Sequence, residues 1–102
     1  MATKVSSKDA PSGADGEIAL AKGALVAMRM WRDEPPTDDK PSTTSEHETV
    51  GYVIAGRAKL VLEDRTVALE PGDSYCVPAG IAHTYHILET FTAIEATAPA
   101  AA

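Results

Sequence analysis

Three histidines are the residues of this chain best suited to chemistry: His47, His83 and His86. Imidazole binds transition metals and exchanges protons near neutral pH, so it serves metal sites and acid–base catalysis alike. His83 closes the stretch PGDSYCVPAGIAH, in which turn residues stand at fixed intervals: Gly72, Pro78 and Gly80. A metal ion needs three or four converging ligands, so the chain must supply partners if His83 is to hold one.

The other two histidines differ in their prospects as such partners. Successive side chains of a strand alternate between its two faces, so His83 and His86 should point to opposite sides. If His47, Glu48 and His83 converge, two imidazole nitrogens and a carboxylate make an open site of the catalytic type. In the alternative, His47 and His86 are surface residues, and His83 is an interior histidine hydrogen-bonded to a neighbour.

Size and charge argue against several functional classes. The 102 residues suffice for one domain, and the net charge of 9 − 15 = −6, without a Lys or Arg cluster, disfavours a nucleic-acid partner. No apolar run approaches the ~18 residues that cross a bilayer, so we expect no membrane partner. The first residues lack the apolar core of a signal peptide, and the lone Cys76 fits a reducing compartment, so we expect a cytoplasmic location. We expect Cys76 itself to be a small buried side chain.

Short runs rich in Val, Ile, Leu and Tyr, separated by turn residues, predict an antiparallel all-β domain. The expected strands are 24–32, 48–56, 57–64, 66–70, 74–78, 83–89 and 90–97. The pair 48–56 and 57–64 should form a hairpin around Gly56, and strands at this spacing indicate a sandwich or a barrel. We expect a flexible segment over residues 1–17, a single barrel domain over 18–97 and a disordered tail over 98–102.

The segment DEPPTDDKPSTTSE, residues 33–46, has no side chain suited to a core. Loops of this length in a compact domain are usually functional or disordered. Three interpretations stay open: a solvated connector, a flap over the mouth of the barrel, or an arm exchanged with a partner subunit.

The turn residues before His83 resemble a motif of the cupins, which are small jelly-roll barrels. The second cupin motif reads Gly-x5-Pro-x-Gly-x2-His-x3-Asn, and the chain matches it at four positions: Gly72, Pro78, Gly80 and His83. Ile87 stands at the position of the asparagine. The two cupin motifs and the strands between them cover residues 43–97, and the resemblance implies a double-stranded β-helix, the jelly-roll barrel of that family.

The first cupin motif reads His-x-His-x(3,4)-Glu-x6-Gly and is similar to the stretch that ends at Gly56. Counted back from Gly56, the glutamate position is Thr49, and the two histidine positions are Ser45 and Thr43. Hydroxyl groups are poor ligands for zinc, iron, nickel or copper. The resemblance therefore implies that the usual metal site is largely lost and that no cofactor is needed. A divalent metal on the rearranged set His47, Glu48 and His83 is the alternative.

Without a metal, the interior could hold one small organic ligand. If His83 faces inward, so do Tyr85 and Ile87, and Thr49 would share the inner face with the small residues Gly51, Val53 and Ala55. One choice of faces adds Arg29, Trp31 and Glu95 to the interior. In the other choice, Arg29 and Glu95 form a solvated pair outside, and Trp31 lies at a subunit contact.

The predicted ligand-binding residues are therefore His83, Tyr85, Arg29, Trp31, Thr49 and Val53. The catalytic candidates are His83, Tyr85 and Glu95, because a histidine beside a phenol or a carboxyl group can move a proton on a bound sugar or keto acid.

Three functions follow from these alternatives. The first is a small-molecule-binding cupin barrel, the second a metal-dependent isomerase or dioxygenase, and the third a structural or regulatory dimeric barrel. Small cupins commonly dimerise, so the resemblance also implies a homodimer, for which Tyr52 and Ile54 on the outer face are candidate contacts.

Overall fold

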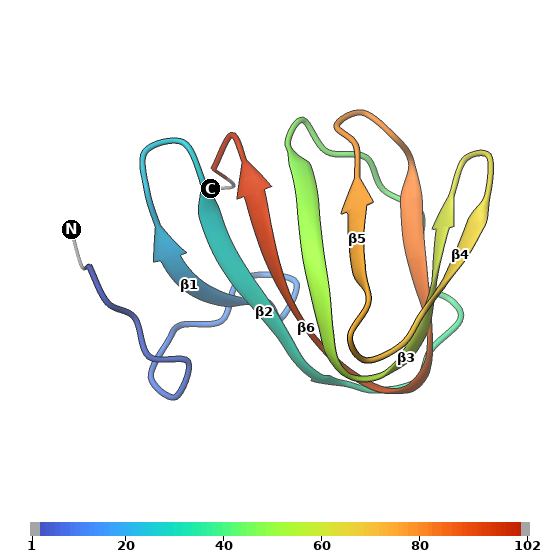
Figure 1. Ribbon diagram of the computed structural model, residues 1–102, viewed down its shortest axis with the longest axis horizontal. Helices are drawn as coiled ribbons and strands as arrows, with labels where there is room; N and C mark the ends of the chain where they lie inside the picture. The colour runs from blue at the N-terminus through green and yellow to red at the C-terminus, as the bar shows by residue number, and fades with distance from the viewer. Residues whose placement is uncertain (1–2, 101–102) are drawn as a thin grey trace.

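The computed structural model describes residues 3–100 and consists of six β-strands (Figure 1). The strands are β1 (Ile18–Lys22), β2 (Ala27–Glu34), β3 (Glu48–Leu62), β4 (Thr66–Leu69), β5 (Ser74–Val77) and β6 (His83–Ala98). All pairings between them are antiparallel, which confirms the predicted all-β class. No helix within the described range is long and apolar enough to cross a membrane. The expected segments 1–17 and 98–102 each include residues that lie outside the described range.

The two long strands β3 and β6 pair along almost their whole length and carry the rest of the sheet. The order is β1-β2-β6-β3-β4, and β5 adds to the other end of β3. The first half of β3 lies between β5 and the last part of β6, whereas its second half lies between β4 and the first part of β6. Figure 1 shows these strands curving upward on both sides, so that the sheet folds over and encloses an interior.

The bend of β3 occurs at Gly56, where the sequence predicts the end of a strand. The chain continues through Gly56 as one strand, and the register with β6 shifts repeatedly between Val53 and Ala58. Gly56 has a φ of +83°, and a β-carbon there would overlap with the carbonyl oxygen of Thr90. The prediction of a hairpin around Gly56 is therefore wrong. The glycine lets β3 bend closely against the backbone of β6. β6 is likewise one continuous strand, where the sequence predicts two.

The same bend switches which residues of β3 face the interior. Before it, the buried positions are Thr49, Gly51 and Val53; after it, they are Ala58, Leu60 and Leu62. The inward positions thus change from odd to even numbers, because the irregular stretch inserts an extra residue. Ala55, which the unbroken alternation places inside, is exposed. The sequence also did not predict β1, a short edge strand.

The segment between β2 and β3 runs along the free edge of β6. Thr37 and Ile87 exchange two backbone hydrogen bonds of 3.0 and 2.8 Å, and Thr43 and His83 exchange two of 2.9 Å. The hydroxyl of Thr84 donates a further bond to the carbonyl of Lys40. The acidic, proline-rich stretch is therefore attached to the sheet as an irregular extra edge.

The outer face of the sheet carries a group of exposed apolar side chains: Met28, Val50, Tyr52 and Ile54. Cys76 of β5 is exposed as well, so the expectation of a buried cysteine is wrong. Tyr52 and Ile54 are thus accessible for contact, and the homodimer through this face stays a prediction.

The close approach at Gly56 gives a testable stability difference. We expect Gly56→Ala to lower the free energy of unfolding by at least about 3 kcal/mol, because it adds backbone overlap to the strain of a positive φ. Gly80 is the matched control: its φ is +79°, and a β-carbon there would have open space. Gly80→Ala should cost only about 1–2 kcal/mol. Urea denaturation measures both values, and equal losses would show that backbone proximity is unimportant.

Candidate ligand-binding cavity

A row of four residues crosses the sheet from β2 to β5 and forms the floor of the interior. Arg29 of β2 pairs with Glu95 of β6, Glu95 with Gly51 of β3, and Gly51 with Tyr75 of β5. Directly opposed residues of antiparallel strands point to the same face. The register of four strands therefore gathers these side chains on the concave side, and the alternative of an exposed Arg29–Glu95 pair is not the observed one.

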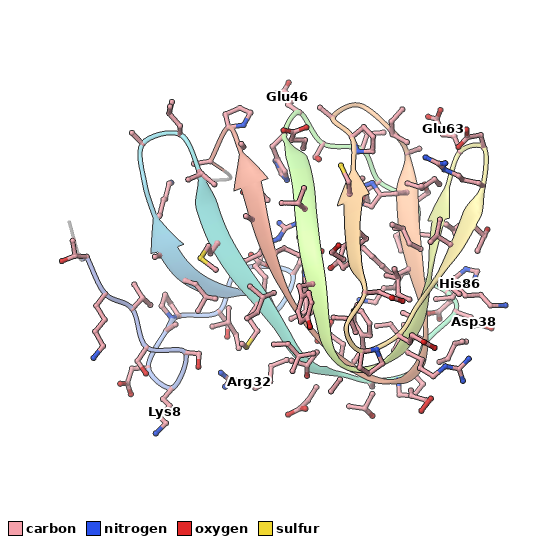
Figure 2. The ribbon with its side chains drawn as sticks, in the orientation of Figure 1. Lys8, Arg32, Asp38, Glu46, Glu63 and His86 are labelled. Atoms are coloured by element: carbon pink, nitrogen blue, oxygen red, sulfur yellow. The ribbon has the colours of Figure 1, made fainter. Side chains whose placement is uncertain are left out.

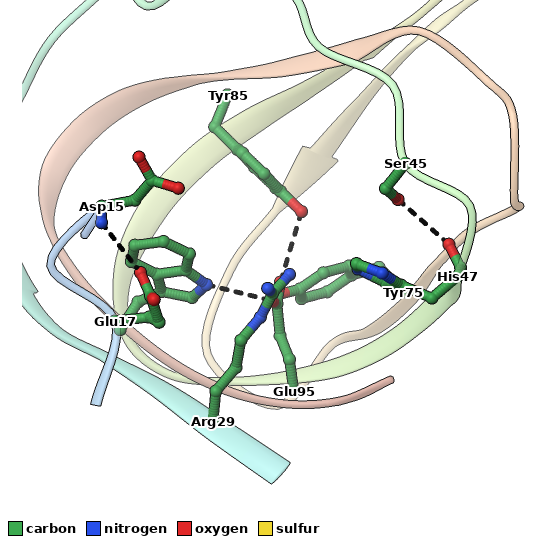
Figure 3. A network of polar contacts seen from close by, with 9 residues as sticks. Asp15, Glu17, Arg29, Ser45, His47, Tyr75, Tyr85 and Glu95 are labelled. Carbon is green, nitrogen blue, oxygen red and sulfur yellow. Dashed lines mark hydrogen bonds and ion pairs between the residues drawn. The ribbon is translucent and has the colours of Figure 1, made fainter. Parts of the chain in front are cut away.

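The carboxylate of Glu95 is the centre of this row and has only 1% of its surface exposed. Its Oε1 accepts hydrogen bonds from Nε of Arg29 at 2.8 Å and from Nε1 of Trp31 at 2.9 Å. Its Oε2 accepts from the hydroxyls of Tyr75 at 2.6 Å and Tyr85 at 3.3 Å (Figure 3). Four donors thus use the accepting capacity of the carboxylate, and the positive charge of Arg29 compensates its negative charge.

Gly51 is what allows Tyr75 to reach Glu95. A β-carbon on Gly51 would overlap with the ring of Tyr75, so this ring lies directly over the glycine. The sequence predicts that small inward residues leave room for a ligand. At Gly51 that room is occupied by Tyr75, which the sequence pattern did not indicate as a residue of the site. A glycine inside a strand is a sign of such close approach and is the signal that could have indicated it.

Burial and the negative charge of Glu95 determine the protonation of both tyrosines. Burial raises the pKa of Tyr75, and the neighbouring carboxylate raises it further. Burial, followed by the charge of Glu95, also raises the pKa of Tyr85 well above its ordinary value. Both residues are consequently protonated phenols at neutral pH that donate to Glu95, and neither can act there as a base.

Above this floor lies a cavity of about 460 Å³. Of the residues predicted to bind a ligand, five line it: Arg29, Trp31, Thr49, His83 and Tyr85. Val53 does not, because it is fully buried in the apolar core. Glu95 and His47 also line the cavity. The segment after β2 supplies a wall that includes Lys40 and Thr43, which the sequence pattern did not indicate as binding residues.

The three histidines fall into two groups. His83 and His47 line the cavity, whereas His86 points away from the interior of the fold (Figure 2). Nδ1 of His83 lies 3.1 Å from the carbonyl oxygen of Ile81; because a carbonyl oxygen only accepts, the neutral form of the ring carries its proton on Nδ1 and presents Nε2 as an acceptor. Burial lowers the pKa of His47, and the charge of Arg29 lowers it further, so this imidazole is neutral at pH 7.

The donor set does not fit a metal. Within residues 3–100, no group of three or more His, Cys, Asp or Glu side chains is arranged to hold an ion. His47, Glu48 and His83 therefore do not form such a group; Glu48 is exposed and does not line the cavity. Of the four cupin ligand positions, three carry hydroxyls, on Thr43, Ser45 and Thr49, and only the position of His83 carries an imidazole.

The raised pKa values of Tyr75 and Tyr85 predict alkaline instability. Below pH 10 both phenols are protonated in the folded and unfolded states, and their contribution to stability is fully present. Above pH 10 the unfolded chain loses protons that the folded chain keeps. We expect the free energy of unfolding to fall by about 1.4 kcal/mol per pH unit for each tyrosine. Urea titrations between pH 9 and 11 measure how the free energy of unfolding changes with pH. This dependence should be flatter in the double variant Tyr75→Phe/Tyr85→Phe than in the wild type. An unchanged dependence would contradict the raised pKa values of the two tyrosines.

Comparison with known proteins gives the fold a family. The pattern of the family described as "Cupin domain" matches residues 29–94. An RmlC-like cupin from Shewanella frigidimarina superposes with a TM-score of 0.82 at 16% identity, covering 97% of this chain and 92% of that one. KdgF from a Halomonas species gives 0.65 at 23% identity, covering 81% and 78%. No curated protein matches the chain significantly. The chain belongs to the cupin family, and its fold is the predicted cupin fold.

Proposed function

We propose that this cupin binds a small organic molecule in the cavity between the halves of its folded sheet. The observation that supports this proposal is the cavity itself, because its volume of about 460 Å³ lies within the range of about 300–1,000 Å³ typical of small-molecule sites. The fold alone does not specify a ligand, so the proposal depends on the lining.

The lining combines aromatic surface with hydrogen-bonding groups that have capacity left. Trp31, Tyr85 and Phe91 offer apolar faces. Arg29 uses Nε for Glu95, and its two terminal nitrogens have no hydrogen-bond partner among the described residues. Nε2 of His83 is likewise without a hydrogen-bond partner in residues 3–100. A ligand with a compact carbon body and polar substituents meets both kinds of surface.

His83 is the residue that we propose for any proton transfer in this cavity. Of the three catalytic candidates, Tyr85 and Glu95 are bonded to each other, so the phenol proton and the carboxylate lone pairs are already engaged. Of the three, only His83 combines a ring held by a hydrogen bond with an accepting nitrogen that has no partner in residues 3–100. A reaction that uses this site would therefore begin with proton abstraction at Nε2.

Binding can be followed through Trp31, the only tryptophan of the chain. We expect sugars, organic acids or polar amines that enter the cavity to change its emission. His83→Ala should weaken the binding of any such compound about tenfold, because a buried hydrogen bond is lost. His86→Ala removes an imidazole from the outer side of the same strand and should leave affinity unchanged. Equal affinity in the wild type and His83→Ala would contradict a site at this histidine.

We also propose that the barrel functions without a bound metal, because the described donors do not form a ligand set. Treatment with EDTA followed by desalting should change neither the melting temperature nor the fluorescence titration. Elemental analysis after incubation with Fe, Zn, Mn, Ni or Cu measures the same point directly. A near-stoichiometric metal that is retained by the wild type and lost in His47→Ala would contradict this proposal and support the rearranged site.

A further inference from the structure

The charged groups of the cavity are not equally available to a ligand. Within residues 3–100, Glu95 has the one deeply buried carboxylate, and this group already accepts four hydrogen bonds. Glu34 lies 3.5 Å from Nζ of Lys40, and Asp15 belongs to the exposed N-terminal segment at the rim. An ammonium group that entered the cavity would therefore find no buried carboxylate with spare accepting capacity.

Arg29 offers the opposite situation. Its Nε is held at 2.8 Å by Glu95, and its guanidinium carbon lies 5.5 Å from the centroid of the Trp31 ring. These contacts fix the plane of the guanidinium, although 24% of the side chain remains exposed. The edge formed by its two terminal nitrogens matches the spacing of two carboxylate oxygens, which makes a bidentate pair possible.

Lys40 adds a second positive charge at the wall of the cavity. Its Nζ lies 6.0 Å from the centroid of the Trp31 ring, so Arg29 and Lys40 both contact the same indole. Lys40 belongs to the segment that the Thr37 and Thr43 hydrogen bonds attach to β6. Its side chain is 40% exposed, and its ion pair with Glu34 is loose enough to be exchanged for a ligand.

We propose that the ligand is a small organic acid whose carboxylate pairs with the terminal nitrogens of Arg29, with Lys40 beside it and the carbon body against Trp31. This inference rests on the proposed binding function and adds the chemical class. Among the charged side chains that line the interior in residues 3–100, the guanidinium of Arg29 is the one with unused hydrogen-bonding capacity, which favours an anion over an amine. The acceptors Nε2 of His83 and the hydroxyl of Thr49 suit further hydroxyl groups on the same molecule.

Two matched sets of probes test the charge class. The first set is cyclohexanecarboxylate, cyclohexanecarboxamide, cyclohexylmethanol and cyclohexylmethylamine; the second is gluconate, gluconamide, sorbitol and glucamine. Each is titrated into the full chain with Trp31 emission and melting temperature as readouts. We expect the acid of at least one set to bind ten or more times more tightly than its amide, with affinity falling as salt is added.

Variants connect the preference to these residues. Lys40→Ala should lower the affinity for the acid severalfold and leave the amide unaffected. Lys59→Ala is its matched control, since it removes the same charge from an exposed position of β3 outside the cavity. Arg29→Lys keeps the charge beside Glu95 but loses the bidentate edge, and should lower acid affinity about tenfold. If Arg29→Lys proves unstable on heating, the anion preference is tested by comparing the loss of acid affinity in Lys40→Ala with that in Lys59→Ala.

The outcomes distinguish a failure of the anion preference from a failure of the proposed small-molecule binding. If probes bind but in neither set the acid binds more tightly than its amide, alcohol and amine, the anion preference is overturned and the cavity remains a ligand site. Equal losses in Lys40→Ala and Lys59→Ala would also overturn it, because the effect would then be one of net charge. If no probe of either set alters the emission or the melting temperature, the inference and the proposed binding function both fail.

Discussion

The carboxylate of Glu95 lies in the interior with almost no solvent contact, and a charge in that position must be compensated or it destabilises the fold. Its four donors come from β2, β5 and β6, and β2 is distant in sequence from the other two. These strands can satisfy the carboxylate together only in one register. The network therefore selects the pairing of the sheet as well as occupying its floor, and a slip of one residue in any of the strands would remove a donor from the interior.

This network also prepares the cavity before any ligand arrives. Arg29 and Trp31 are both held by Oε1 of Glu95, so their orientations are fixed by the protein. Tyr85 is fixed by Oε2 and lies edge-on to His83, with 6.0 Å between the ring centroids. A ligand that uses these side chains would not have to order them first, which lowers the entropic cost of binding.

Much of the arrangement was predictable from local pattern. The alternation of β6 correctly separates His83, Tyr85 and Ile87 from His86, because the inward positions on both sides of Glu89 keep the same parity. It also puts Glu95 on the face of Phe91 and Ala93. The glycine and proline spacing around His83 was sufficient to predict the cupin fold, because such turns depend on residues that stand close together in sequence.

What the pattern could not supply depends on contacts between distant segments. Tyr75 reaches Glu95 through the register of β5 against Gly51, which no local periodicity encodes. The change of parity at Gly56 follows from the backbone of Thr90 passing beside it. Lys40 enters the cavity because a segment without strand propensity is held on β6 by backbone hydrogen bonds of Thr37 and Thr43 and by the hydroxyl of Thr84.

That attachment of residues 37–43 has a consequence for solubility. The amide and carbonyl groups of His83 and Ile87 form the edge of a long strand, and such an edge can pair with another chain when it is uncovered. The backbone of Thr37 and Thr43 forms hydrogen bonds with these groups within the same molecule. Admitting a bulky compound by lifting the segment would break four backbone hydrogen bonds and uncover a surface prone to aggregation. Access to the interior and protection of the strand edge are thus opposing demands on one stretch of chain. The negatively charged Asp38 and Asp39 within this stretch would repel the same segment of a second molecule when both are lifted.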